Sequence, residues 1–292
     1  MATSTLLKNK LQSLKKQYDS LRSGKESLLH MIDEAEIAEA VYNSNAIENS
    51  TLTLKETEKI LLELEVSKEL NLREVYEAKN LARIVEYTRI KSQEMTLTKE
   101  LILLLHTMLL GAINDKIAGR FRIKGEYVRV GTYIASAPEH VERMIEDILT
   151  QYANDVTSFY IDKIALFHLD FENIHPFNDG NGRIGRVLIN FQLEQLHLPS
   201  IIIRDKEKQH YYRAFSDYRD DKNTTTMEKV VAYVLIEALH KRITYLKGDT
   251  IIKLSDYAKQ NDFSLQSILN KARRQTIPAF RERGVWKIGV SK

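Results

Sequence analysis

Twelve consecutive residues, His175 to Arg186, combine side-chain and backbone types that suit phosphate chemistry. Gly180, Asn181 and Gly182 can adopt backbone conformations that bulky residues avoid, so their N–H groups can converge on an anion. Apolar residues recur with helical spacing after Arg183, which predicts a helix that begins at this loop. A helix N-terminus adds unpaired N–H donors and the positive end of its dipole. The stretch therefore predicts a phosphate-binding loop.

Four side chains of the same stretch are of types that act on phosphates. Arg183 and Arg186 stand three residues apart, so both guanidinium groups can lie on one helix face and clamp phosphate oxygens. Asp179 offers a hard carboxylate for Mg²⁺. His175 is the group there that accepts a proton near neutral pH. Each residue alone has an ordinary structural interpretation, but their occurrence within twelve residues favours a functional site.

This stretch resembles the motif of the Fic family, His-Pro-Phe-x-Asp/Glu-Gly-Asn-Gly-Arg-x-x-Arg, and it matches every specified position. The resemblance implies Mg²⁺-dependent transfer of AMP from ATP to a Ser, Thr or Tyr hydroxyl of a protein target, which can be the protein itself. It implies His175 as general base and Asp179 as Mg²⁺ ligand. The Doc branch, which transfers a phosphoryl group, has lysine where this chain has Gly182. The resemblance to the Fic motif also implies a set of nucleotide-binding residues: Asn178, Gly180, Asn181, Gly182, Arg183 and Arg186.

Ser44 to Asn49, at the end of an expected helix, resembles the Fic inhibitory motif Ser/Thr-x-x-x-Glu-Gly/Asn. Taken alone, Glu48 is a surface carboxylate at a helix end. The resemblance implies that Glu48 pairs with Arg186 and keeps the γ-phosphate of ATP from its productive place, with Ser44 as part of the inhibitory motif. A carboxylate–arginine pair is directional and repels a phosphate that competes for the same guanidinium.

Two further groups of residues are of types that suit such a site. Tyr211 and Tyr212 begin a helix and resemble the family's adenine wall, although core packing for one of them is nearly as well supported. His168 and the nearby Asp170 raise the alternative of a metal site. Because His168 lies in an apolar helical stretch, we expect a hydrogen-bonded core histidine instead.

Composition predicts a protein of long helices in the cytoplasm. The 292 residues include 11 Gly, 4 Pro and no Cys, and the net charge is +3. Scarce Gly and Pro favour helices with short turns, and the lack of Cys fits a reducing compartment. The N-terminus lacks the apolar segment of a signal peptide. The longest apolar run, Leu101 to Ile113, is too short to span a bilayer, so no membrane partner is expected.

Residue periodicity predicts helices along most of the chain and one β-hairpin before the motif. The hairpin is expected over Arg120 to Ile134, where apolar and polar residues alternate around Gly125 and Gly131. In the Fic family a hairpin in this position aligns the target's backbone, as strand addition explains. A helix with an apolar stripe is expected at residues 7–21, with pairing into a homodimer as the alternative to packing within the chain. Further helices are expected at Glu26–Ile47, Lys55–Leu64 (opened by a capping box at Thr53), Glu69–Lys91, Thr98–Ala112, Glu139–Ala153, Thr157–Glu172, 183–196, from 209 onward, and Met227–Leu246.

The last 43 residues differ from the rest in charge. Residues 250–292 hold nine Lys or Arg and three Asp or Glu, a net +6. Two short helices, 254–258 and 264–269, precede a hairpin at 277–288. This pattern resembles the winged helix-turn-helix of excisionase-type and MerR-type DNA-binding modules. A basic face of this kind binds DNA phosphates, docks a protein or is simply a solvated surface.

These observations predict an all-α protein with a Fic-type helical core, a small β-hairpin flap and a C-terminal winged-helix-like module. We expect an N-terminal helical region with the inhibitory helix (1–97), a catalytic core (98–248) and the module (249–292). The leading function is AMP transfer. The alternatives are removal of AMP from a modified protein by the same site, with Glu48 orienting a water, and a DNA-bound regulator whose core senses nucleotide.

Overall fold

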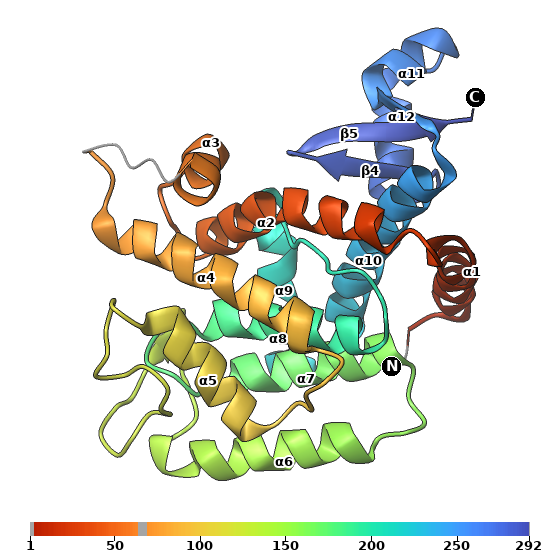
Figure 1. Ribbon diagram of the computed structural model, residues 1–292. Coiled ribbons are helices and arrows are strands. Elements are labelled where there is room, and N and C mark those ends of the chain that lie inside the picture. Colours follow the sequence, from red (N-terminus) through yellow and green to blue (C-terminus); the bar gives the residue numbers. More distant parts are fainter. Residues whose placement is uncertain (1–2, 64–68, 292) are drawn as a thin grey trace. The chain divides into compact units, whose positions relative to one another are not determined.

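The computed structural model describes residues 3–63 and 69–291, and it is mostly helical, as expected (Figure 1). Its contacts group into two compact units. The first consists mainly of Ile37–Leu198 and Ile202–Val230, and the second of Ser4–Glu36 and Val231–Lys292. The linear division at 97/98 and 248/249 stays a prediction. None of the helices in these residues is long and apolar enough to cross a membrane.

The first unit is a bundle of helices that surrounds the predicted phosphate loop. Figure 1 shows α7 and α8 side by side, and both contact further helices of the unit. Two helices, α2 (Glu26–Ile47) and α10 (Thr225–Lys247), contribute residues to both units. The other helices of this unit are α3 (Leu54–Glu58), α4 (Leu72–Lys91), α5 (Lys99–Leu110), α6 (Val141–Asn154), α7 (Tyr160–Ile174), α8 (Asn181–Gln195) and α9 (Lys208–Asp221), with short 3₁₀ turns at Pro138–His140 and Asp205–Glu207.

Helix α5 supplies much of the core of this unit. It begins at Thr98, whose side chain accepts a hydrogen bond from the N–H of Leu101. Five of its apolar residues are buried (Leu101, Ile102, Leu105, Leu109 and Leu110), whereas Leu104 is 40% exposed. Phe177 of the motif is fully buried, and its ring stacks on His106 of α5 at 3.6 Å. The core therefore anchors the loop that carries the candidate site.

Local end signals explain where several helices begin and end. Thr53 and Glu56 form the expected capping box. Asn49, with a left-handed φ of 68°, lies just after the end of α2. Helix α4 starts at Leu72 instead of Glu69 because the Asn71 side chain caps the N–H of Arg73. The helix expected at Lys55–Leu64 is α-helical only to Glu58 and continues as a π-helical turn, Lys59–Glu63; Leu64 lies outside the described residues.

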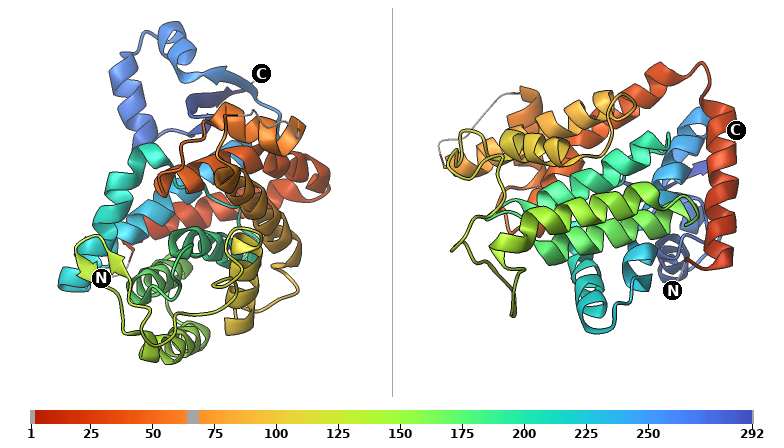
Figure 2. Two further views of the ribbon diagram at one scale, coloured as in Figure 1. Left: turned by 90° about the vertical axis from the view of Figure 1, so that its left-hand side faces the viewer. Right: turned by 90° about the horizontal axis from the view of Figure 1, so that it is seen from below.

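The β-hairpin is much shorter than expected. Only β1 (Arg129–Val130) and β2 (Tyr133–Ile134) pair, around Gly131, in the small yellow-green hairpin of the left view in Figure 2. The prediction of strands from Arg120 was wrong because Arg122 lies inside the fold, 3% exposed. Its guanidinium donates to backbone carbonyls on both sides of the hairpin, and this holds the preceding segment in irregular structure.

The second unit contains α1 (Thr5–Arg22) and a small α/β module at the C-terminus. The module runs β3 (Thr250–Lys253), α11 (Leu254–Gln260), α12 (Leu265–Arg273), β4 (Ala279–Glu282) and β5 (Val285–Val290). Its strands form an antiparallel sheet in the order β3-β5-β4. The two helices and the hairpin were expected, whereas β3 was missed. It was missed because this strand forms by pairing with β5, which is distant in the sequence.

Candidate active site

The loop between α7 and α8 is shaped by its own side chains. Helix α7 ends where His175 takes a left-handed conformation (φ 53°), and Gly180 does the same (φ 85°) before α8. The Asn181 side chain accepts from the N–H of Phe177 and donates to the carbonyl of Phe177, each at 2.8 Å. Asn181 is 3% exposed, so its side chain fixes the loop and only its backbone remains for an anion.

The N-terminus of α8 has the features of an anion site. Its first N–H groups have no partner within the helix, and the helix dipole favours negative charge there. A Cβ at Gly182 would lie 2.2 Å from Oε1 of Glu48, so the approach of Glu48 requires glycine at this position. The glycines predicted as the cradle therefore also make room for the end of α2.

Arg186 is bound to the end of α2. The guanidinium is 7% exposed and donates to Oε1 of Glu48 at 2.9 Å, to Oγ of Ser44 at 2.9 Å and to the Ser44 carbonyl at 2.8 Å. Burial by itself lowers the pKa of Arg186, but Glu48, Tyr211 and Glu172 together outweigh it, and the net shift is upward. Arg186 is thus held as a cation by residues 138 and 142 positions away in the sequence.

Arg183 and Asp179 belong to an ion network with α4. Arg183 donates to Asp179 at 2.9 Å and pairs with Glu77 at 3.1 Å. The other carboxylate oxygen of Asp179 lies 2.5 Å from Arg73, which also pairs with Glu77. Sequence reasoning missed Arg73 and Glu77, whose i,i+4 spacing is typical of any solvated helix face.

A cleft of about 360 Å³ lies beside this network, lined by Glu48, Arg73, Glu74, Glu77, Asp179 and Arg183 among others. No group of three His, Cys, Asp or Glu side chains able to hold a metal occurs in residues 3–63 and 69–291. Mg²⁺ is commonly bound by one or two carboxylates together with substrate phosphates and water. The donor set, one carboxylate beside an anion site, fits that mode of binding, with Asp179 as the protein ligand.

His175 is placed to act as a base. Burial lowers its pKa to about 4, so the imidazole is neutral near neutral pH and can accept a proton. Its carbonyl accepts a 2.8 Å hydrogen bond from Arg122. Its Nδ1 lies 3.8 Å from a carboxylate oxygen of Glu172, a residue that the sequence did not single out.

His106 also contacts the loop and was not predicted. The N–H of Gly119 donates to its Nδ1 at 3.0 Å, so the ring proton resides on Nε2, which lies 3.0 Å from the Asp179 carbonyl. Burial lowers the pKa of His106 to about 4 and keeps this ring neutral. Its sequence signal, a single histidine in an apolar run, is too common to identify such a contact.

The remaining predicted residues lie around these groups. Tyr211 is 2% exposed and its hydroxyl lies 2.7 Å from Nε2 of His168, which places Tyr211 in the core. Burial lowers the pKa of His168 to about 3, as expected of a core histidine. Tyr212 is 39% exposed and donates to the Ile47 carbonyl at the end of α2. The Asn178 side chain hydrogen-bonds to Glu126. Adenine contact by either tyrosine stays a prediction.

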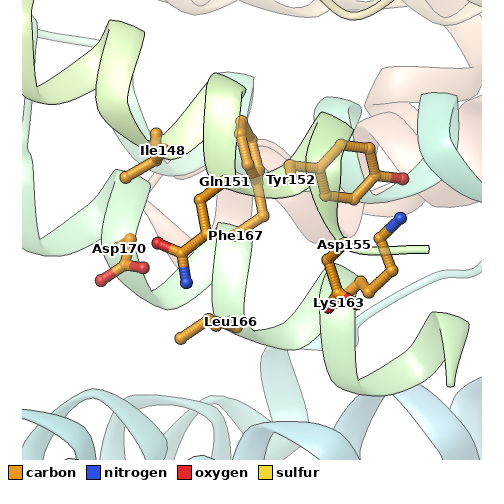
Figure 3. Close-up of a pocket in the computed structure, with 8 residues that line it drawn as sticks. All are labelled: Ile148, Gln151, Tyr152, Asp155, Lys163, Leu166, Phe167 and Asp170. Carbon is orange, nitrogen blue, oxygen red and sulfur yellow. The ribbon is translucent and has the colours of Figure 1, made fainter. Parts of the chain in front are cut away.

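A second hollow lies between α6 and α7, away from these residues (Figure 3). Its volume is about 20 Å³, room for about one water molecule. Lys163 lies over the ring of Tyr152 at 4.6 Å, and Asp155 and Asp170 also line the wall. No residue of the predicted site is among its lining residues, so it is not a candidate for the nucleotide.

Comparisons with known proteins agree with the motif. Residues 96–193 match the sequence profile of the Fic/DOC family. Protein adenylyltransferase Fic of Nematostella vectensis is 29% identical over 252 residues, which cover 84% of this chain and 57% of that protein. Protein adenylyltransferase fic-1 of Caenorhabditis elegans is 31% identical over 178 residues, 59% of this chain and 34% of that protein. The matched region thus spans less than two thirds of the length of these curated relatives.

The fold has a counterpart among solved structures. A Fic domain containing signaling protein from Bacteroides thetaiotaomicron VPI-5482 superposes with a TM-score of 0.75 and 25% sequence identity. The match covers 82% of this chain and 98% of that one.

Proposed function

The chain is a Fic/DOC domain protein related to the protein adenylyltransferases named Fic, and from this premise we propose that it transfers AMP from ATP to a hydroxyl side chain of a protein. The observation that carries the proposal is one loop with a neutral, buried histidine at one end and a glycine-lined helix N-terminus at the other. The first suits a proton acceptor and the second suits phosphates.

In the proposed reaction, the target hydroxyl oxygen forms a bond to the α-phosphorus of ATP, and the bond to the bridging oxygen breaks to release pyrophosphate. His175 takes the hydroxyl proton. The first N–H groups of α8, with Arg183 and Arg186, stabilise the charge on the phosphates. Asp179 would hold Mg²⁺, which supplies further neutralisation of phosphate charge when bound. The hydroxyl belongs to a Ser, Thr or Tyr side chain of a target or of this protein.

We further propose that Glu48 restrains this activity. The support is that Arg186 is occupied by Glu48 and Ser44, so a phosphate must compete with a carboxylate and a hydroxyl for the same guanidinium. Carboxylate–arginine hydrogen bonds are charge-assisted and strong, and a second anion at the same place is repelled. Release of Glu48 would free Arg186 for the outermost phosphate.

Removal of AMP from a modified protein is the second candidate. The side chain of Glu48 keeps 38% of its surface exposed, which leaves it accessible to a water beside the same loop. A carboxylate in this place suits the orientation of a hydrolytic water.

The test is to incubate the protein with a cell lysate and ATP labelled at either the α- or the γ-phosphate. AMP transfer predicts protein labelled from α-labelled ATP above the level that the lysate gives without the added protein. An increase over that baseline from the γ-position instead would indicate phosphoryl transfer and would contradict the proposal. Release of labelled AMP from a previously modified target would identify the removal reaction instead.

A further inference from the structure

Glu172, in the last turn of α7, lies behind the imidazole of His175. Its Oε2 is 3.8 Å from Nδ1 of His175, and the two side chains are 12% and 17% exposed. Neither Nδ1 of His175 nor Oε1 of Glu172 has a hydrogen-bond partner among the described residues. Buried polar atoms without partners are rare. At a candidate active site, such a pair suits a hydrogen bond that forms when one of the two groups gains or loses a proton.

Gly185 explains how a carboxyl group fits at this position. A Cβ at Gly185 would lie 2.6 Å from Oε1 of Glu172 and 2.8 Å from Cε1 of His168. A residue other than glycine at position 185 would therefore displace the Glu172 carboxyl group from its place beside His175. Because residue 185 of α8 has no side chain, the space between α7 and α8 at this point holds the Glu172 carboxyl group.

Charged and titratable groups face Glu172 from four other parts of the chain. Glu48 follows α2, Tyr133 is on β2, Arg186 is on α8, and Tyr211 and Tyr212 are on α9; His168 lies on the same helix as Glu172, and His175 comes directly after that helix. Burial raises the pKa of Glu172 to about 8; Glu48 adds to this shift and Arg186 opposes it. The Glu172 carboxyl group thus changes charge in the pH range in which His175 would act as a base.

We propose that Glu172 is the positioning residue of His175: its carboxylate accepts the Nδ1–H of the imidazole, so that Nε2 presents a lone pair to the target hydroxyl. The inference rests on the proposed AMP transfer. When His175 takes the hydroxyl proton, the resulting imidazolium gains a neighbouring carboxylate. A protonated Glu172 does the opposite, because its O–H donates to Nδ1 and leaves the ring proton on Nε2.

The backbone carbonyl of Glu172 also faces His175 and favours its protonated form. Glu172→Gln separates the effect of this carbonyl on His175 from the effect of the carboxyl group. The variant keeps the carbonyl and the side-chain volume and removes only the ionisable group. Kinetics are best compared in a Glu48→Gly background, in which transfer is expected to be faster. There Glu172→Gln should lower kcat about 10- to 100-fold, as is usual for a partner that orients a functional histidine. ATP affinity should not change.

The pH dependence distinguishes positioning from a purely structural role. With Glu172 present, the rate should rise with pH as its carboxyl group ionises, and this rise should be lost in Glu172→Gln. The matched control is Asp170→Asn on the same helix, whose carboxylate bonds to Tyr218 at 2.5 Å instead. It should keep the parental pH profile. A parental rate and profile in Glu172→Gln would overturn the inference.

Stability gives a second measurement. A carboxyl group with a raised native pKa keeps a proton that the unfolded chain has already released, so stability falls as pH rises from about 4.5 to about 8. Glu172→Gln lacks this loss, and its Tm relative to the parent should increase over that range. A Tm difference that does not vary with pH would show that Glu172 is ordinarily ionised and would overturn the proton-dependent step.

¹⁵N NMR of the imidazole does not require enzymatic activity. The parent should show His175 with its proton on Nδ1 at high pH, and Glu172→Gln should shift the balance between the ring nitrogens. If the parent transfers no AMP, the proposed function fails while this measurement still decides the pairing. An unchanged balance in Glu172→Gln would overturn the inference even in an active enzyme.

Discussion

At the scale of single residues, His175 and its surroundings determine whether a proton can be accepted. His175→Ala should abolish transfer from α-labelled ATP, because loss of a general base typically costs about 10²- to 10⁴-fold in rate. Nδ1 of its side chain has no hydrogen-bond partner among the described residues, and the ring lies beside the anion site instead of within it, so ATP binding should persist. A folded variant that binds ATP and transfers at the parental rate would refute the role of His175.

The pair of Glu48 and Arg186 leads to a second prediction at this scale. Glu48→Gly should increase self-labelling, because it removes the carboxylate that lies 2.9 Å from the Arg186 guanidinium. Glu48→Gln is the sharper control, since it keeps nearly the same volume without the charge. If the charge pair is the restraint, Gln should activate nearly as well as Gly.

Arg186→Ala separates release of the restraint from catalytic competence. It breaks the same pair, yet it should not activate, because the outer phosphate loses its own partner. The restraint proposed for Glu48 fails if Glu48→Gly folds, binds ATP with Mg²⁺ and labels no more than the parent protein does.

At the scale of elements, α4 contacts Asp179, the proposed Mg²⁺ ligand, through Arg73. The guanidinium of Arg73 lies 2.5 Å from Asp179, and its side chain is 55% exposed. Exposed ion pairs contribute about 0.2–1 kcal/mol, so Arg73→Gln should strengthen metal binding by only about 1.4- to fivefold. Titration of Mn²⁺ in the presence of ATP, in a His175→Ala background, measures this change.

Arg143→Gln is the matched control for that titration. Arg143 pairs with Asp147 on α6 at 3.8 Å and is 84% exposed, so its loss removes the same charge but leaves the contact between Arg73 and Asp179 intact. An equal change in both variants would mean that general charge, and not the contact with Asp179, sets the affinity. Weaker binding in Arg73→Gln would contradict the competition altogether.

Elements were predictable from the sequence where a local signal fixes them. The capping box at Thr53 depends on neighbours within a few residues, and it is present. The hairpin was predicted too long because alternation of residue types gives no warning that Arg122 turns inward to distant carbonyls. Strand β3 was missed for the related reason that its partner β5 is some 35 residues away.

At the scale of the whole molecule, the candidate site combines residues that no spacing rule connects. The residues of the motif lie in one loop, so sequence alone could group them. Glu48 was found through its resemblance to a known motif and not through physical reasoning. Arg73 and Glu77 were missed because the helix that carries them contacts Asp179 and Arg183 only in the folded chain. Long-range contacts of this kind leave no periodic trace in the sequence.

The C-terminal module gives a prediction about a macromolecular partner. Helix α12 carries no acidic residue. Asn270 and Lys271 of this helix and Arg274 just after it are exposed and are of types that contact DNA. We expect the full chain to bind duplex DNA with an affinity that falls steeply as salt increases, because phosphate contacts release counterions. Fluorescence anisotropy at several salt concentrations measures this slope.

Charge reversal at two positions tests where the DNA binds. Lys271→Glu with Arg274→Glu should weaken binding and reduce the salt dependence. The control is Lys206→Glu with Lys229→Glu, two exposed lysines outside the module that give the same change in net charge. Equal effects of the two pairs would indicate attraction by overall charge. Absence of salt-dependent binding at low ionic strength would leave protein docking as the role of this surface.

Arg122 has a consequence for the motions of the protein. One guanidinium bonds to the carbonyls of Ile174 and His175 before the phosphate loop and to those of Glu126 and Ser136 around the hairpin. Opening either segment alone would leave buried carbonyls without a donor, so the two are expected to fluctuate as one cooperative unit. Their amide protons should then exchange with solvent with a common protection factor. By the same coupling, a target that docks on the hairpin would reduce the motion of His175, the residue proposed to remove the proton of that target.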